Sequence, residues 1–582
     1  MTQAAAHGTI AIPEAATSQV ATSLHDCDVA VADLVEHSKP WFEAEPGELV
    51  GLLERLNEAL IAGSQDWVDA SCAAKHIPSD SALAGEEWAS VSITARYLRL
   101  LAAALTDIAA GQKPQFPGRP HPATGGHTAV PAFPFDAFDK VALSGFSAEI
   151  WLRRGVAGAQ AVERQAAAWF GGGSAGVSLV LGAGNVASIP VTDALDRLFI
   201  TRHPVILKMN PVNDYLGPIF ERVFGELVDR GVLRIVYGGA EVGTHLVRHD
   251  GVTEVHVTGS DKTFEAIVFG SGEDGARRLA ANDPLVTKPV TGELGNVSPV
   301  IVVPGPWAPK DIAFQAQNLA SMLANNGGFN CIALRAIVTS NSWDLRDQLL
   351  DGVRDVLGEV GSRYPYYPGA RDRYERFVAA HPEAERFGDD SPGCVPWTLI
   401  PGLQPESKDE IAFTTESFNG VFGEVGIDAT GTVDFIRKAV EFANNGMWGT
   451  LGCSLIVHPK TVAEPEVARA VEQAIADLRY GTIAVNHWSA VGFLLGSTPW
   501  GAYPGHTAND VQSGIGFVHN SMMLDEADIE KTVVRGPFRM PVKPTWFVTN
   551  KTAQRSGEMF ARLMAKPTWG KLPGLITTAL RG

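Results

Sequence analysis

A cysteine and a glutamate in glycine-rich surroundings are the residues of this chain best suited to chemistry. Cys331 lies in Asn325-Asn326-Gly327-Gly328-Phe329-Asn330-Cys331-Ile332-Ala333, and Glu293 lies upstream in Thr291-Gly292-Glu293-Leu294-Gly295. A thiolate attacks carbonyl carbons, and a carboxylate within reach, directly or through one water, activates the water that later releases the acyl group. The pair therefore predicts a thiol nucleophile with a general base. A lone cysteine before an apolar run is more often an inert core residue, so this prediction depends on its context.

These two segments resemble the glutamate and cysteine signatures of the aldehyde dehydrogenase superfamily, in the family's order and at about its usual separation. Other segments resemble further motifs of that family at the matching places: Val205-Ile206-Leu207-Lys208, Val257-Thr258-Gly259-Ser260, Glu416-Ser417-Phe418, Asn444-Asn445-Gly446-Met447-Trp448-Gly449 and Pro499-Trp500-Gly501-Ala502-Tyr503. The resemblance covers roughly residues 150–525. Weak motifs that follow one another in the right order make a specific signal together.

The resemblance implies an α/β fold with two Rossmann-like parallel-sheet domains and a small β oligomerisation arm. It assigns Asn185 and the backbone N–H of Cys331 to the oxyanion of the tetrahedral intermediate, where each preformed donor is typically worth about 3 kcal/mol. It also implies a dinucleotide cofactor, NAD or NADP, and no metal. The cofactor-binding residues that it implies are Lys208, Gly259, Ser260, Leu294, Glu416 and Phe418.

The segment around Asn185 has a second interpretation. Gly182-Ala183-Gly184-Asn185-Val186-Ala187 matches a loose dinucleotide fingerprint, in which glycines let the backbone approach a pyrophosphate. That fingerprint requires an acidic residue about 20 positions later, and the end of the next strand offers Lys208 instead. The residues themselves leave turn chemistry open for Asn185, because asparagine is common in glycine-rich turns.

Several positions depart from the family pattern and indicate a divergent branch. They are Asn296 and Val297 after Glu-Leu-Gly, Phe329 before the cysteine, Asn419-Gly420 after Phe418, Phe264 where a small residue is usual, and Pro211 where NAD-preferring members often have a carboxylate. Phe264 either shifts the pyrophosphate or fills a gap. Pro211 removes a negative charge, so a 2′-phosphate is tolerable and NADP is an expected cofactor alongside NAD.

The leading hypothesis is the oxidation of a small-molecule aldehyde to a carboxylic acid with NAD(P)+. The retained Glu293 favours hydrolysis of the thioester, because branches that pass the acyl group to coenzyme A commonly lack that base. The alternatives are an acyl-CoA reductase that uses the same cysteine in the other direction and, from another class, a non-catalytic structural homologue. A GxSxG match at Gly172-Gly173-Ser174-Ala175-Gly176 precedes a strand rather than following one, which argues against a serine hydrolase.

Composition excludes several other classes. The 582-residue chain is 45% hydrophobic and 19% charged, with a net charge of −18, which argues against nucleic acid or an anionic membrane as the main partner. Its five scattered cysteines favour a reducing compartment, and we expect a cytoplasmic protein. The resemblance implies a homodimer or homotetramer. Pro567, Gly570, Pro573 and Gly574 interrupt the C-terminal stretch Met559–Arg581, which predicts a packed or solvated tail.

The order of patterns along the chain predicts its organisation. We expect residues 1–23 to be disordered, Val29–Ile108 to be helical and the Pro- and Gly-rich stretch Gln112–Phe138 to be a loop or insertion. Alternating strand-like and helix-like runs from Gly176 to about Asn486 predict two α/β domains. The arm is placed in Val141–Gly171 and Arg539–Val548, where Trp546-Phe547-Val548 is strand-like.

These expectations divide the chain into five parts. They are a helical N-terminal region with the Pro/Gly-rich insertion, part of the cofactor domain (1–138), an oligomerisation arm (139–171), an NAD(P)-binding domain (172–292), a catalytic domain with the cysteine nucleophile (293–500), and a late loop, bridging strand and C-terminal tail (501–582).

Overall fold

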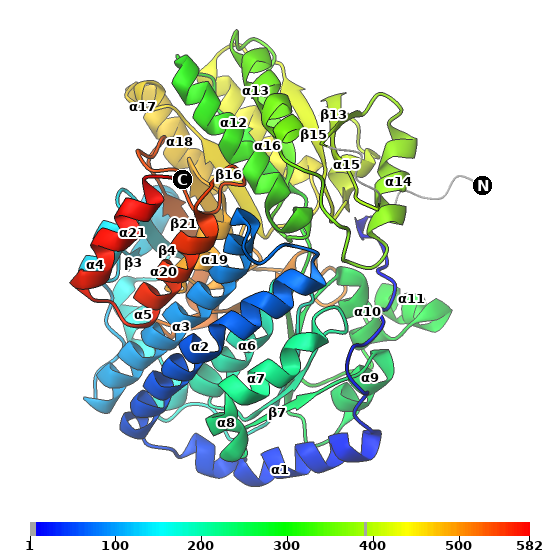
Figure 1. The fold of residues 1–582 in the computed structure, drawn as a ribbon, viewed down its shortest axis with the longest axis vertical. Coiled ribbons are helices and arrows are strands. Elements are labelled where there is room, and N and C mark those ends of the chain that lie inside the picture. The colour runs from blue at the N-terminus through cyan, green and yellow to red at the C-terminus, as the bar shows by residue number, and fades with distance from the viewer. Residues whose placement is uncertain (1–6, 389–392) are drawn as a thin grey trace.

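Two β-sheets organise the α/β fold and meet at the middle of the molecule (Figure 1). The computed structural model describes residues 7–388 and 393–582. In the view of Figure 1 the sheet of the upper half carries the helices α12 to α18, and the sheet of the lower half carries α6 to α10. The fold class expected from the alternating strand and helix patterns is confirmed.

The lower sheet has six strands in the order β19-β9-β8-β5-β6-β7. Their bounds are β5 Ser178–Leu181, β6 Val205–Lys208, β7 Leu233–Val236, β8 Glu254–Thr258, β9 Val290–Glu293 and β19 Gly514–Ile515. All neighbours are parallel except β19, which pairs antiparallel with β9. Successive side chains of β5 point to opposite faces: Leu179 packs with α1 and α9, and Val180 packs with α2 and α3. Burial on both faces explains why these strands read as short continuous apolar runs.

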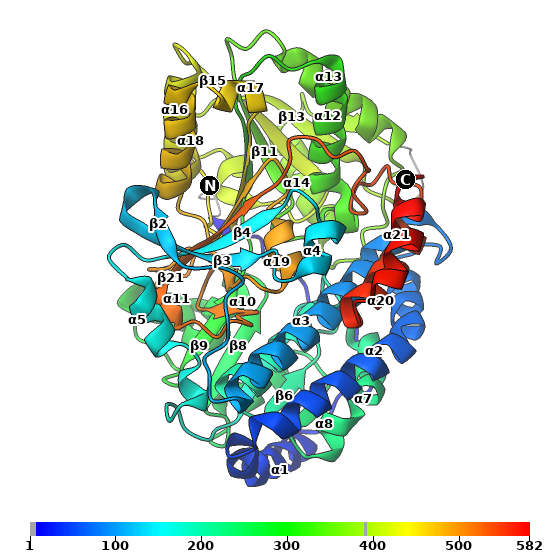
Figure 2. The same cartoon turned by 90° about the vertical axis from the view of Figure 1, so that its left-hand side faces the viewer.

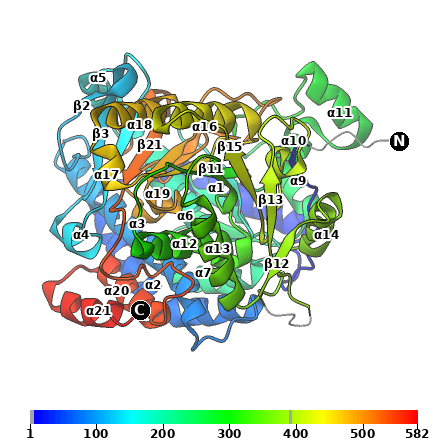
Figure 3. The same ribbon diagram turned by 90° about the horizontal axis from the view of Figure 1, so that it is seen from above.

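The upper sheet has eleven strands in the order β12-β13-β15-β11-β10-β16-β17-β21-β4-β3-β2, and the edge strand β12 comprises Glu385–Phe387. Its parallel centre consists of β13 Trp397–Leu403, β15 Val421–Ile427, β11 Leu334–Ser340, β10 Ser298–Val302, β16 Gly452–Ile456, β17 Thr482–Val485 and β21 Ile529–Arg535. Figure 3 shows α12 (Pro309–Ala324) and α13 (Arg346–Glu359) on one face and α16 (Thr432–Gly446) and α18 (Pro465–Asp477) on the other. Two apolar clusters fill these interfaces, as the doubly wound pattern requires.

The β arm differs from its expected position. The prediction of a strand at Trp546–Val548 is wrong, because no strand lies in 539–548, whereas β4 (Ser147–Leu152) lies inside the predicted 141–171. Its partners β2 (His121–Ala123) and β3 (His127–Phe133) lie in the stretch predicted to be an irregular loop. The arm pairs with β21 and thereby extends the upper sheet (Figure 2). Prolines mark edge strands as readily as loops, so the proline-rich composition was misleading here.

The helices at the two ends of the chain pack together. The helical prediction for residues 29–108 is confirmed by α1 (Leu24–Phe42), α2 (Pro46–Ala74) and α3 (Gly85–Ala109). The tail forms α20 (Ala553–Ala565), which lies beside α2 and α3, and α21 (Leu572–Ala579), which packs on α20 (Figure 2). Their apolar residues join the cluster under the lower sheet, so the tail is packed. No helix in residues 7–388 or 393–582 combines the length and apolarity needed to cross a membrane.

The prediction of disorder before residue 23 is wrong for residues 7–23, and residues 1–6 lie outside the described part. Gly8–Thr9 form strand β1, which pairs in parallel with β14 (Thr415–Glu416). From there the chain runs down the side of the molecule past α10 and α9 to the start of α1 (Figure 1). Composition alone predicted disorder because Ala-, Thr- and Ser-rich segments lack a periodic apolar face.

Candidate active site

Cys331 lies where a glycine-rich turn delivers the chain from α12 to β11. Asn326, Gly327 and Gly328 all have left-handed backbone conformations, with φ of 54°, 67° and 81°. A Cβ at Gly328 would come within 2.4 Å of the Asn419 carbonyl oxygen, so the turn requires glycine there. This turn places the partly exposed thiol between the two sheets.

Glu293 ends strand β9 and reaches the thiol directly. Its carboxyl hydrogen-bonds with Cys331 and with Trp500, while its Oε1 has no hydrogen-bond partner among the described residues. Burial raises the pKa of Glu293 to about 8. Burial, with the neighbouring Glu293, also raises the pKa of the Cys331 thiol well above its usual range. At neutral pH both the Glu293 carboxyl and the Cys331 thiol are therefore protonated. Once Glu293 has lost its proton, its carboxylate can accept the proton of the thiol.

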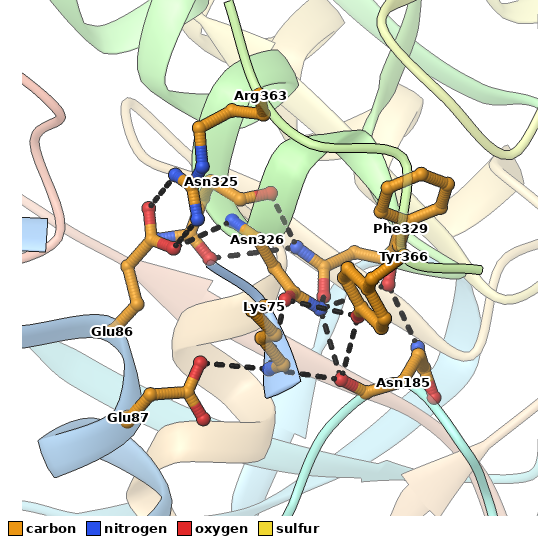
Figure 4. Close-up of polar contacts among 10 residues, drawn as sticks. Lys75, Glu86, Glu87, Asn185, Asn325, Asn326, Phe329, Arg363 and Tyr366 are labelled. Atoms are coloured by element: carbon orange, nitrogen blue, oxygen red, sulfur yellow. Dashed lines mark hydrogen bonds and ion pairs between the residues drawn. The ribbon is translucent and has the colours of Figure 1, made fainter. Parts of the chain in front are cut away.

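Asn185 lies in the turn between β5 and α6 (Ile189–Asp196), next to the cysteine loop. Its Nδ2 donates to the Phe329 carbonyl at 3.0 Å, and a second N–H remains on the same nitrogen. Its backbone carbonyl accepts from Asn326 Nδ2 at 3.0 Å, Tyr366 Oη at 3.0 Å and Lys75 Nζ at 3.3 Å (Figure 4). Three donors on one carbonyl fix the turn beside the thiol.

An apolar tunnel opens on one side of the thiol. It encloses about 130 Å³ and includes Glu293 and Cys331 in its lining. Most of its wall is aliphatic or aromatic, and this part comprises Ile93, Val186, Trp488, Phe493, Trp500 and Trp546. Its charged members are Lys75, Glu86 and Glu87 from the helical N-terminal region. An apolar wall with few polar groups is the usual form of a small-molecule site.

On the other side of the thiol lies a groove along the edge of the lower sheet, where the predicted cofactor residues gather. Asn185, Gly259, Ser260, Glu416 and Phe418 line a small cavity of about 30 Å³ that also includes Cys331 and Glu293. Ser260 caps helix α10 (Asp261–Phe269), whose N-terminal amides suit a phosphate. Both cavities therefore meet at the same thiol and carboxyl.

Lys208 and Leu294 lie near this groove without lining the cavity. Lys208 ends β6, is 8% exposed, and burial lowers the pKa of its ammonium to about 8. The Leu294 side chain is buried with Phe264 and Val511 behind the groove. Phe264 is fully buried in the same cluster, so it fills a gap in the core.

One unpartnered polar atom in the groove is suited to a nucleotide hydroxyl. Glu416 is 2% exposed, and its Oε1 has no hydrogen-bond partner among the described residues. Burial raises the pKa of this carboxyl to about 8. A ribose hydroxyl is the kind of donor that such a buried acceptor requires. Nothing lies within 4 Å of a Cβ built on Gly259, so the turn before α10 is open on that side.

Comparison with known proteins agrees with this geometry. Residues 175–360 match the model described as "Aldehyde dehydrogenase family". An NADP-dependent glyceraldehyde-3-phosphate dehydrogenase structure from Bacillus halodurans covers 90% of this chain and 95% of its own, at 17% identity and a TM-score of 0.59. An aldehyde dehydrogenase from Mycobacterium tuberculosis, solved with NAD+, covers 88% and 91%, at 19% identity and a TM-score of 0.57. Residues 175–360 are thus similar in sequence to the aldehyde dehydrogenase family, and the fold of the chain is that of solved aldehyde dehydrogenases.

The sequence similarity is concentrated in one region of the chain. The N-succinylglutamate 5-semialdehyde dehydrogenase of Novosphingobium aromaticivorans is 27% identical over 186 residues, which are 32% of this chain and 36% of that protein. The match thus spans about a third of that relative's length. The matched family segment includes Asn185, Glu293 and Cys331 and ends before Glu416.

The sequence patterns did not predict several residues of the site. Tyr367 and Arg373 line the small cavity, and the Tyr-Pro-Tyr-Tyr-Pro-Gly run that carries Tyr367 is an aromatic signal that deserved weight. Lys75 and Tyr366 hold the Asn185 turn, and no local pattern marks the lysine. Ser174 of the GxSxG match lies exposed before β5, as its inverted context predicted.

Proposed function

We propose that the protein oxidises an aldehyde to a carboxylic acid with NAD or NADP through a thioester on Cys331. The observation that carries the proposal is the hydrogen-bonded Cys331–Glu293 pair at the junction of an apolar tunnel and the groove in which the predicted cofactor residues gather. The tunnel supplies the aldehyde to one side of the sulfur. The cofactor-binding residues stand on the other side.

Glu293 takes the thiol proton, and the thiolate adds to the carbonyl carbon in the tunnel. The backbone N–H of Cys331 and the free N–H of Asn185 donate to the oxygen that becomes negatively charged. A bound nicotinamide would supply the oxidising chemistry at this stage by accepting a hydride. Glu293 next releases that proton to solvent, and its carboxylate takes a proton from water, which attacks the thioester. The carboxylic acid departs, and the Cys331 thiolate regains a proton from Glu293.

Glu416, Phe418, Gly259 and Ser260 would hold the nicotinamide half and the phosphates, and Lys208 the adenosine ribose. Phe418 has a left-handed φ of 44°, which is unusual for a bulky residue and is typical of a position fixed for function. Its ring packs against Tyr367 and Phe329. These contacts hold the clamp beside the cysteine loop.

The decisive experiment is a panel of aldehydes and acyl-CoAs with NAD(H) and NADP(H), followed at the nicotinamide absorbance. We expect aldehyde-dependent reduction of NAD+ or NADP+ without coenzyme A. Oxidation of NAD(P)H that depends on an acyl-CoA would instead support the reductase reading. A chain that binds no dinucleotide and turns over neither class would be a structural homologue.

We also propose that copies of the chain associate through the arm. Strand β2 ends the eleven-stranded sheet, and its first two residues are exposed. An exposed strand edge offers unpaired N–H and C=O groups to a second copy. Sedimentation of the purified protein tests this, with a dimer or tetramer expected and a monomer contradicting it.

A further inference from the structure

The charged groups of the tunnel restrict the aldehyde that it accepts. Lys75 Nζ donates to Glu87 at 2.7 Å and to Asn326 Oδ1 at 3.0 Å. Burial by itself would lower the pKa of Lys75, but Glu87, Tyr215 and Glu86 together outweigh burial and raise it, so the ammonium persists. Glu86 pairs with Arg363 at 3.0 Å (Figure 4). The one cation of this wall is therefore neutralised, and an anionic substrate finds no counter-charge in the tunnel.

The tunnel nevertheless keeps polar atoms without partners. Glu87 accepts from Lys75 through Oε1, while its Oε2 has no hydrogen-bond partner among the described residues, and its side chain is 2% exposed. Trp546 Nε1 is also buried and lacks a partner in the described chain. Both residues line the tunnel. A hydroxyl group both donates and accepts, so it can satisfy either atom.

The volume sets the size of the substrate. An apolar cavity of about 150 Å³ in another protein holds benzene, and this tunnel encloses about 130 Å³. Building on the proposed function, we propose that the substrate is an uncharged aldehyde with one ring or a body of similar size and a hydroxyl group distant from the carbonyl. The hydroxyl donates to Glu87.

The test compares kcat/KM for benzaldehyde, the 3- and 4-hydroxybenzaldehydes, the matching methyl compounds and 4-carboxybenzaldehyde. A hydrogen bond to a buried charged group predicts that at least one hydroxyl compound exceeds its methyl isostere by about 10- to 100-fold. The carboxy compound should be the poorest. The inference would be overturned if the methyl compounds matched both hydroxyl compounds in kcat/KM. It would also be overturned if 4-carboxybenzaldehyde had the highest kcat/KM. Failure to oxidise any aldehyde would instead reject the proposed function.

Two variants show whether Glu87 carries the preference. Glu87→Gln keeps an acceptor for Lys75, and we expect it to reduce the hydroxyl-to-methyl ratio by about tenfold. Glu86→Gln is the matched control. Glu86 also lines the tunnel, but both of its oxygens already accept hydrogen bonds, so this variant should leave the hydroxyl-to-methyl ratio of kcat/KM unchanged. Equal effects of the two variants would contradict a specific role of Glu87.

A second, independent observation concerns the groove, along which residues 8–22 run from end to end. At the nicotinamide end, β1 pairs with β14, and the Thr9 N–H donates to Asp261 at 3.0 Å, directly after Ser260. Further along, Ile12 packs beside Phe418. Thr9, Ile10 and Ile12 all line the small cavity together with Cys331.

The same segment reaches the adenosine end. Glu14 accepts from the Ala240 N–H at 2.8 Å, at the start of helix α9 (Ala240–Arg248). Its charge also acts on Lys208, the residue expected at the adenosine ribose. The N–H groups of Ser18 and Gln19 donate to Asp214 at 2.9 and 3.2 Å, and Thr22 pairs with Tyr237. The Glu14 carboxylate thus lies at the adenosine end of the groove, where a bound nucleotide would place a negatively charged group.

The space that remains is too small for a cofactor. Sites for small ligands usually have about 300–1,000 Å³, whereas the cavity beside Thr9 has about 30 Å³. We infer that residues 8–22 form a strap that competes with the dinucleotide for the groove and leaves when the cofactor binds. This inference also rests on the proposed function.

Removal of residues 2–22 tests the strap. A binding site that is mostly covered weakens apparent affinity in proportion to the covered fraction, so the truncated chain should bind NAD+ or NADP+ at least about tenfold more tightly by titration calorimetry. Glu14→Gln should tighten binding in the same direction, with Glu36→Gln on the exposed face of α1 as its matched control. Equal affinities for all four proteins would overturn the strap, whereas no binding by any would reject the dinucleotide site.

Hydrogen exchange on the full chain provides a readout that needs no variant. Added dinucleotide should accelerate exchange of the Thr9, Ser18 and Gln19 amides, whose hydrogen bonds to Asp261 and Asp214 would break. Binding beside an undisplaced segment would slow these amides. Slower exchange on binding would therefore contradict the inference.

Discussion

The tunnel and the groove on either side of Cys331 differ in what fills them. The tunnel is enclosed by side chains from the N-terminal helices and the late loop and keeps about 130 Å³. The groove has the residues for a dinucleotide, but residues of the N-terminal segment lie in it and leave about 30 Å³. One half of this site is therefore preformed, whereas the other is assembled only after the strap moves.

The largest effect is expected for Cys331→Ala, which removes the nucleophile shared by both cavities. Turnover should fall by more than about 10³-fold, because no other group in the site can form the thioester. Dinucleotide affinity should stay unchanged, since the groove residues are intact. The measurements are steady-state rates and calorimetric titration. Retained turnover would contradict the covalent mechanism.

Glu293→Gln should lower kcat by about 10²- to 10³-fold, because an amide cannot accept a proton from the thiol or from water. The wild-type rate should rise with pH and level off near the Glu293 pKa of about 8, since only the deprotonated carboxylate acts as a base. The variant should lose this ascending limb. Loss of steady-state rate with a full burst of NAD(P)H would restrict the role of Glu293 to deacylation.

Lys75→Met tests the tunnel side. It leaves Glu87 buried without its partner, and breaking a buried pair in this way costs about 3–5 kcal/mol in the free energy of unfolding. It also removes a donor from the Asn185 carbonyl, so kcat should fall while dinucleotide affinity is unchanged. Denaturant unfolding and titration provide the measurements. The control is Lys460→Met at an exposed position. If Lys75→Met and Lys460→Met both had an equally small effect on the free energy of unfolding, the Lys75–Glu87 pair would not be structural.

Pro211→Glu tests the groove side and has the smallest expected effect. A carboxylate near the adenosine ribose should shift the kcat/KM ratio toward NAD over NADP by about tenfold. Asp214 is buried and accepts hydrogen bonds from residues 18 and 19; when these residues leave the groove, its carboxylate adds a second negative charge and reduces the effect of the substitution. The wild-type ratio of kcat/KM for NADP over NAD should fall as pH rises through about 8, where Lys208 loses its charge. The control is Pro465→Glu at an exposed position. If both variants changed the kcat/KM ratio equally, the loop that contains Pro211 would not determine the cofactor preference.

Local patterns predicted much of the fold and the centre of the site. Short apolar runs such as Val205–Lys208 became buried parallel strands because a strand buried on both faces carries its signal in consecutive residues. The order and spacing of Glu293 and Cys331 matched a family signature, and the structure brings their side chains into hydrogen-bond contact. The order of the sequence motifs also predicted where the loops between these elements lie.

What the tertiary structure decided lies in contacts between residues far apart in the chain. The Thr9 amide meets Asp261 across 252 positions, and Lys75 meets Asn326 across 251. Neither polar residue belongs to a periodic face, so its own neighbours in the sequence carry no information about its partner. The sequence by itself determined the strands, the nucleophile and its base. Only the tertiary structure decided which groups neutralise the Lys75 charge in the tunnel and which segment fills the groove. Buried charges and unpaired backbone groups bind whichever partner the fold brings within reach.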